Sequence, residues 1–113
     1  MNDRELLEMA AKAAGIHIDK SPYNGGGIGN TGFDMAGNAV LDWHNYKTWN
    51  PLTDDGDAMR LAVEIYLFDG SLFELFKQFR LEEVRKDSSR TDFEITRRAI
   101  VRAAAEIGKG VMK

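Results

Sequence analysis

The segment that most constrains this 113-residue chain is WNPLTDDGDAMRLAV, residues 49–63, because it has the composition of a strong helix start. Pro51 disfavours helical backbone at the residue before it. Thr53 or Asp54 can accept a hydrogen bond from the first free backbone N–H groups, and the acidic run places negative charge at the positive end of the helix dipole. We therefore predict a helix over about 54–65, whose apolar residues recur at helical spacing: Ala58, Leu61, Ala62 and Ile65.

Residues 3–14 have the pattern of a second amphipathic helix. Asn2 and Glu5 have the spacing of a capping box. Gly15 follows, a residue that readily takes the left-handed conformation at a helix end. The small alanines of this segment predict close packing against another element.

A third helix is predicted over about 92–109, where Thr91 and Glu94 form another capping pattern. Two pairs of opposite charge spaced i, i+4 predict ion pairs on its outer face: Glu94 with Arg98, and Arg102 with Glu106.

Strands are expected between the first two helices. Segments 16–19, 28–35 and 39–44 have alternating or β-prone sequences, and Ala36-Gly37-Asn38 has turn chemistry. Residues 45–50 then form an aromatic-rich connection. This order predicts an antiparallel or mixed sheet.

Residues 66–86 are compatible with two structures. Asp69-Gly70 is a hairpin turn sequence, whereas a helix beginning at Ser71 is also compatible with the apolar spacing as far as Phe79. Beyond Phe79 the helical stripe fails, because Leu81 and Val84 fall on other faces. We favour strands, since three helices need a sheet wide enough to cover.

Three segments together carry a resemblance to a known family. NDRELLEMAAKAAGI, WNPLTDDGDAMRLAV and TRRAIVRAAAEIGKG, at residues 2–16, 49–63 and 96–110, resemble the phage ABA (alpha-beta-alpha) sandwich family of small uncharacterised bacteriophage proteins. The resemblance implies a bacteriophage or prophage origin, a place in the host cytoplasm and a sandwich fold. It brings no established activity and no catalytic residues.

The order of the predicted elements and the family resemblance both indicate an α/β fold class that is α+β-like. It is a single domain over 1–113, in which three helices (about 3–14, 54–65 and 92–109) cover an antiparallel or mixed sheet. There are no cysteines, so disulfides and thiolate metal sites are excluded. No apolar run approaches the roughly 20 residues that a membrane span needs, so no membrane association is expected.

The charge of the chain is unevenly distributed. Residues 1–71 hold 5 basic and 11 acidic side chains, whereas residues 72–113 hold 10 basic and 7 acidic ones. The basic part contains a candidate anion-binding cluster near a helix start, although Asp92 and Glu94 oppose an anion there: Arg90, Arg97, Arg98 and Arg102. Because the net charge is −3, we expect no nucleic-acid binding.

Three features have some of the residues of a reactive or ligand-binding site but lack the rest of its pattern. Gly27 to Gly32 matches GxGxxG, but the strand before it and the helix after it that dinucleotide binding requires are missing. The acidic run 54–57 lacks the spacing of a calcium loop, so capping is preferred. His17 and His44 could form a metal or acid–base site only if their strands are neighbours. We expect no metal, no cofactor and no catalytic residues.

The best candidate contact surface is an aromatic segment that also holds a histidine: Trp43, His44, Tyr46 and Trp49. Aromatic side chains supply much of the contact energy in small interfaces. The leading hypothesis is therefore a non-enzymatic phage accessory protein that binds an unknown host or phage protein. The alternative is a small enzyme or nucleotide- or anion-binding protein that uses the glycine loop 25–32, His44 and the C-terminal arginines.

Overall fold

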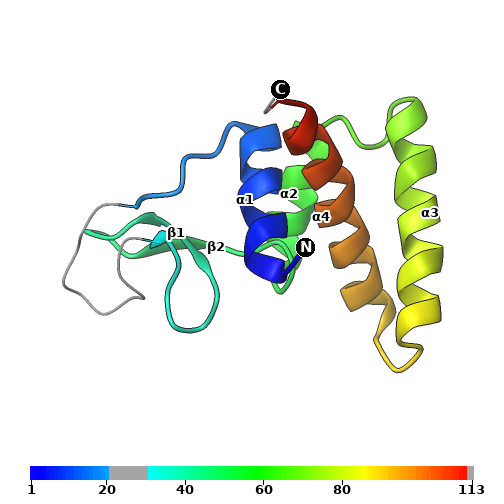
Figure 1. The fold of residues 1–113 in the computed structure, drawn as a ribbon, viewed down its shortest axis with the longest axis horizontal. Coiled ribbons are helices and arrows are strands. Elements are labelled where there is room, and N and C mark those ends of the chain that lie inside the picture. Colours follow the sequence, from blue (N-terminus) through cyan, green and yellow to red (C-terminus); the bar gives the residue numbers. More distant parts are fainter. Residues whose placement is uncertain (21–30, 112–113) are drawn as a thin grey trace.

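A computed structural model describes residues 1–20 and 31–111 of the chain. Four helices lie side by side and a small hairpin projects from one flank (Figure 1). The elements are α1 (Asp3–Ala14), β1 (Ala39–Asp42), β2 (Lys47–Trp49), α2 (Asp55–Glu64), α3 (Ser71–Lys86) and α4 (Asp92–Val111). The expected mixture of helix and sheet is thus confirmed. None of the described helices has the length and apolar character needed to cross a membrane.

The helix ends predicted from local sequence are confirmed. Asn2 and Glu5 form the capping box of α1, and Gly15 ends that helix with a φ of 70°. Of the two candidate caps of α2, Asp54 is the one used, and its carboxylate accepts from the backbone N–H of Asp57 at 2.8 Å. Thr91 caps α4 by accepting from the backbone N–H of Glu94.

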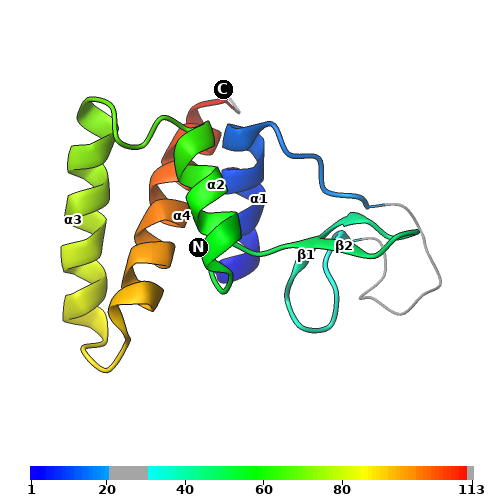
Figure 2. The same cartoon turned by 180° about the vertical axis from the view of Figure 1, so that it is seen from behind.

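Helix α4 is the centre of the fold and contacts each of the other three helices. Figures 1 and 2 show α1 and α3 on opposite sides of it, with α2 across its other face. The predicted close packing of α1 is confirmed, because Ala10 of α1 and Ala103 and Ala104 of α4 are all fully buried. A Cβ added to Gly108 of α4 would collide with the backbone of Met9. Small residues therefore set the distance between α1 and α4.

The sheet is smaller than expected. β1 and β2 pair antiparallel, with Ala39 opposite Trp49, and the ladder is irregular between Val40 and Asp42. Residues 16–19 form no strand, although the N–H of Asp19 donates to the carbonyl of Val40 at 2.8 Å. The connection predicted over 45–50 instead contains β2.

The two other predicted strands, 28–35 and 39–44, are shorter than expected or lie partly outside the described residues. Within the predicted strand 28–35, residues 28–30 lie outside the described residues and Phe33 makes only an isolated bridge to Ala39. The predicted strand 39–44 ends at Asp42. The helices pack mainly on one another, and a sandwich in which three helices cover a sheet is not confirmed.

The preference for strands in 66–86 is wrong, because Ser71–Lys86 is a helix. Its buried side is formed by Phe76, Phe79 and Glu83, at positions i, i+3 and i+7, and it packs on α4. A charged residue thus occupies the position where an apolar one would have continued the helical pattern.

Candidate functional site

The turn between β1 and β2 is held in place by the carboxylate of Asp42. It accepts from the backbone N–H of His44 at 2.9 Å and from the side-chain amide of Asn45 at 2.7 Å. The hydrogen bonds from Asn45, and more weakly those from His44, hold the pKa of Asp42 below its ordinary value. The carboxylate therefore stays ionised and keeps the turn fixed near neutral pH.

A second turn, residues 34–38, lies beside the first. Asp34 accepts from the backbone N–H groups of Ala36 at 3.0 Å and Asn38 at 2.9 Å, and the hydroxyl of Tyr46 donates to it at 2.5 Å. Burial tends to raise the pKa of Asp34, but hydrogen bonds from Tyr46, Asn38 and Ala36 outweigh it and the pKa falls. The Tyr46–Asp34 bond joins the two turns into one unit.

The aromatic segment divides into buried and exposed side chains. Trp43 and Trp49 are each only 5% exposed, and the indole N–H of Trp43 donates to the carbonyl of Asp19 at 2.8 Å. Tyr46 is 56% exposed and has a φ of 51°, and His44 beside it is also exposed. The predicted patch therefore consists of two buried rings, Trp43 and Trp49, which anchor the hairpin, and two exposed side chains, His44 and Tyr46.

We define the hairpin tip as Met35, His44 and Tyr46. Met35 is 78% exposed and belongs to the turn that Tyr46 bonds. The tip presents an aromatic ring, an imidazole and a thioether on a backbone fixed by hydrogen bonds. In the described part of the chain no group of three His, Cys, Asp or Glu side chains could hold a metal ion. This geometry is suited to contact with another molecule.

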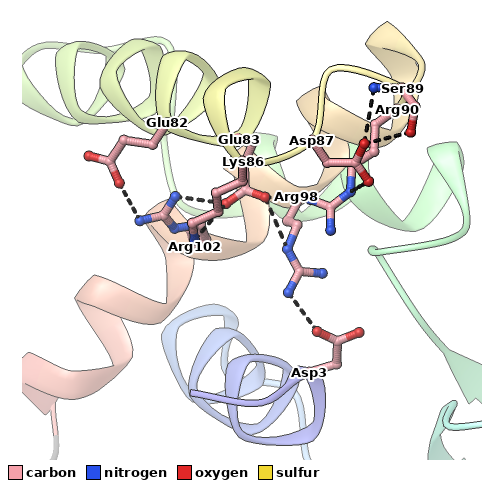
Figure 3. A network of polar contacts seen from close by, with 9 residues as sticks. All are labelled: Asp3, Glu82, Glu83, Lys86, Asp87, Ser89, Arg90, Arg98 and Arg102. Atoms are coloured by element: carbon pink, nitrogen blue, oxygen red, sulfur yellow. Dashed lines mark hydrogen bonds and ion pairs between the residues drawn. The ribbon is translucent and has the colours of Figure 1, made fainter.

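Three of the four candidate arginines converge on one carboxylate of α3, Glu83, as Figure 3 shows. Glu83 has a side chain only 1% exposed and lies 2.6 Å from Arg90, 2.8 Å from Arg102 and 3.3 Å from Arg98. Arg98 also reaches Asp3 of α1 at 2.7 Å. The network therefore links α1, α3 and α4.

Arg97 is not part of this network. It binds Asp55 at 2.6 Å and the carbonyl of Leu52 at 2.9 Å, which fastens α4 to the start of α2. The predicted i, i+4 ion pairs along α4 are wrong, because Arg98 and Arg102 reach other helices and Glu106 pairs with Lys109. Contacts between helices thus replace the contacts expected within one helix.

Electrostatics keep the carboxylate of Glu83 ionised near neutral pH. Burial tends to raise its pKa, but the charges of Lys86, Arg98 and Arg102 outweigh that effect and lower it. An external anion at these arginines would have to displace a carboxylate that is already bound to them. The arginines are accordingly engaged in holding the helices together.

The remaining candidates lie apart from the hairpin tip. His17 lines a surface hollow of about 540 Å³ beside α1, together with Glu8 and Lys12, and His44 does not belong to that hollow. Of the glycine loop 25–32, residues 25–30 lie outside the described residues. Gly32 has a φ of 83°, and a Cβ there would collide with Ile18. A packing requirement therefore accounts for this glycine.

Sequence reasoning missed Glu83 and Asp34, the two buried carboxylates that organise the arginines and the turns. Asp34 could have been found, because an Asp at the start of a segment such as Asp-Met-Ala-Gly-Asn often begins a turn capped by its own side chain. Glu83 lies within a helix and its partners come from other elements, so nothing in the nearby sequence identifies it.

Comparisons with protein-family models, with curated proteins and with solved structures find no match to this chain. The resemblance of the three segments to the phage family therefore stays a prediction.

Proposed function

We propose that this protein is a non-enzymatic bacteriophage accessory protein that acts in the host cytoplasm and binds a host or phage protein through the hairpin tip. The phage origin rests on the resemblance of residues 2–16, 49–63 and 96–110. The binding role rests on the geometry of the hairpin and does not depend on a sandwich arrangement of the fold.

The observation that carries the proposal is the state of Tyr46. Its ring is 56% exposed although its neighbours Trp43 and Trp49 are buried. Its backbone has a φ of 51°, a conformation that is uncommon for a residue other than glycine. The bond to Asp34 fixes the hydroxyl, so little side-chain freedom is left to lose on binding. An exposed, pre-ordered tyrosine is a typical interface anchor.

The alternative, a small enzyme or anion-binding protein, gains no such support. His44 belongs to the hairpin turn, whereas Arg90, Arg98 and Arg102 are bound to Glu83 between the helices. These groups do not converge on a common reacting centre.

The proposal is tested by affinity capture from lysate of phage-infected bacteria with Tyr46→Asn as bait. Asparagine tolerates positive φ, so this change removes the ring and its bond to Asp34 but puts no residue there that the backbone conformation disfavours. Tyr66→Asn is the matched control, since Tyr66 is 73% exposed with a φ of 56° but lies after α2. We expect Tyr46→Asn to lose the captured partner, with affinity lower by about 30-fold if the ring supplies ~2 kcal/mol.

Capture that survives Tyr46→Asn would reject the hairpin tip as the binding surface. Arg98→Ala is unsuitable as the electrostatic comparison, because it would remove a partner of the buried Glu83. Arg85→Ala serves instead, since Arg85 is exposed and forms no ion pair with a described residue. Loss of capture in Arg85→Ala alone would point to an anionic partner.

A further inference from the structure

Helix α3 has a second surface that the fold does not use. Lys77, Leu81 and Val84 follow one another at i, i+4 and i+7, so they share one face of the helix. Leu81 is 60% and Val84 is 42% exposed. Together with Arg80 they line a surface hollow of about 290 Å³ formed by α3 alone. We call Lys77, Arg80, Leu81, Val84 and Arg85 the α3 outer stripe.

The α3 outer stripe is basic. Among the described residues neither Arg80 nor Arg85 forms an ion pair, and Nε of Arg80 is a buried donor without a hydrogen-bond acceptor. Lys77 pairs with Glu74 on the same helix at 3.0 Å. The stripe thus combines two exposed aliphatic side chains with two guanidinium groups that lack a carboxylate partner.

An apolar groove lies between α2 and α4, with a volume of about 340 Å³. Its walls include Met59, which is 55% exposed, Phe93, which is 67% exposed, and Ile100. Asp55, Asp92 and Arg97 also line it, and Arg97 pairs with Asp55 at 2.6 Å. We call these residues the α2–α4 groove.

The rim around the groove carries more negative than positive charge, because two helices begin beside it. Five carboxylates occupy the starts of α2 and α4, of which Asp55 and Asp92 line the groove, and among the described residues two guanidinium groups, those of Arg60 and Arg97, pair with Asp57 and Asp55. Asp92 forms no ion pair with a described residue. The five carboxylates belong to Asp54, Asp55, Asp57, Asp92 and Glu94.

We propose that the α3 outer stripe of one copy of the chain docks into the α2–α4 groove of a second copy. Leu81 and Val84 supply apolar side chains for the apolar groove. Arg80 and Arg85 form no ion pair with a described residue, and they complement three carboxylates of the helix starts that also form none: Asp92 in the groove, and Asp54 and Glu94. A second copy is the occupant because one chain carries both complementary surfaces. The docking is independent of the hairpin tip.

The two surfaces share no residue, so the contact is heterologous and each copy keeps one groove and one stripe for further neighbours. Such contacts produce open chains or closed rings. One helix stripe in one groove buries less area than a standard interface, so the association is weak and appears at high protein concentration.

The experiment is sedimentation velocity of the whole chain over a series of concentrations, with one variant for each surface. Leu81→Glu places a like charge against the acidic rim, and Met59→Lys places a like charge against the basic stripe. We expect the unaltered chain to form larger species as concentration rises and each variant to stay monomeric. An equimolar mixture of the two variants should form a dimer, because one still has its groove and the other its stripe.

Three controls define the outcome. Lys12→Glu changes the charge of an exposed residue on α1 and should associate like the unaltered chain. The double variant Leu81→Glu/Met59→Lys should be monomeric, which excludes pairing between the two altered surfaces. Circular dichroism checks that each variant is folded.

Two results would overturn the proposal. The first is a chain that stays monomeric at all concentrations. The second is a mixture of single variants that fails to associate, because the intact groove of one variant and the intact stripe of the other would then not bind each other.

Discussion

Glu83 of α3 and Arg102 of α4 are joined at 2.8 Å, and the same guanidinium lies over the ring of Phe79 at 4.0 Å. Arg102 therefore contacts both the polar and the apolar part of the interface between α3 and α4. Because the side chain of Glu83 is 1% exposed, its charge depends on the arginines around it. Helix α3 packs chiefly on α4, so this contact is central to its attachment.

Replacing Glu83 with Gln should destabilise the fold by about 2–4 kcal/mol, because it leaves clustered guanidinium groups without their shared carboxylate. Glu82→Gln is the matched control. Glu82 also binds Arg102 at 2.8 Å, but its side chain is 36% exposed, so its loss should destabilise the fold much less than the loss of Glu83. Urea unfolding of both variants measures the difference. An equal decrease in the free energy of unfolding for both variants would show that the burial of Glu83 does not strengthen its contribution to stability.

Acid should weaken the fold through the same carboxylate. The charges around Glu83 lower its pKa below the ordinary 4.5, so its contribution is present above that pH and is lost as pH falls through the lower pKa of the folded state. Asp34, whose pKa is also lowered, acts in the same direction. We expect the free energy of unfolding to fall as the pH drops below about 4.5, and to fall less in Glu83→Gln. An unchanged slope in that variant would contradict this assignment.

The tyrosine of the hairpin tip should titrate late. The hydrogen bond to Asp34, followed by burial, raises the pKa of Tyr46 above 10.0. Its bond therefore stabilises the hairpin below pH 10 and is lost as pH rises through the higher pKa. Ultraviolet titration of tyrosinate should show a late step that disappears in Tyr46→Phe. The same step lost in Tyr66→Phe would assign it to Tyr66 instead.

The cap of α2 offers a test between two neighbouring residues. Asp54→Ala should destabilise the protein by about 1 kcal/mol, because the backbone N–H of Asp57 loses its acceptor. Thr53→Ala should have a smaller effect, since the hydroxyl of Thr53 makes only a long bond of 3.4 Å to the carbonyl of Asn50. Thermal unfolding of both variants decides which residue is the cap.

The starts of the helices could be predicted because each cap is made by two residues within one helical turn of each other. Asn2 with Glu5 and Asp54 with Asp57 are examples. The arginine network could not, because Glu83 is separated from Arg102 by 19 positions and the contact exists only once α3 and α4 have paired. Local periodicity also failed at Glu83, since a buried charge has the sequence pattern of an exposed one.

The aromatic segment shows the same limit on a smaller scale. Its composition predicted the exposed Tyr46 but could not separate it from Trp43, whose burial depends on a hydrogen bond to Asp19 across 24 positions. Tertiary packing decides whether an aromatic ring is buried. A tyrosine can stay at the surface when its hydroxyl finds a hydrogen-bond partner there.

Two glycines near the end of α4 should respond in opposite directions to the same substitution. A Cβ at Gly108 would collide with the backbone of Met9, whereas one at Gly110 meets nothing within 4 Å. Gly110→Ala should therefore stabilise the protein by up to about 1 kcal/mol, because alanine favours helix. Gly108→Ala gains the same preference but must push α1 away from α4, which should leave a net loss of about 1–3 kcal/mol. Thermal unfolding of the pair measures both signs. Stabilisation by Gly108→Ala would mean that α1 and α4 lie farther apart than the close packing of Ala10 with Ala103 and Ala104 requires.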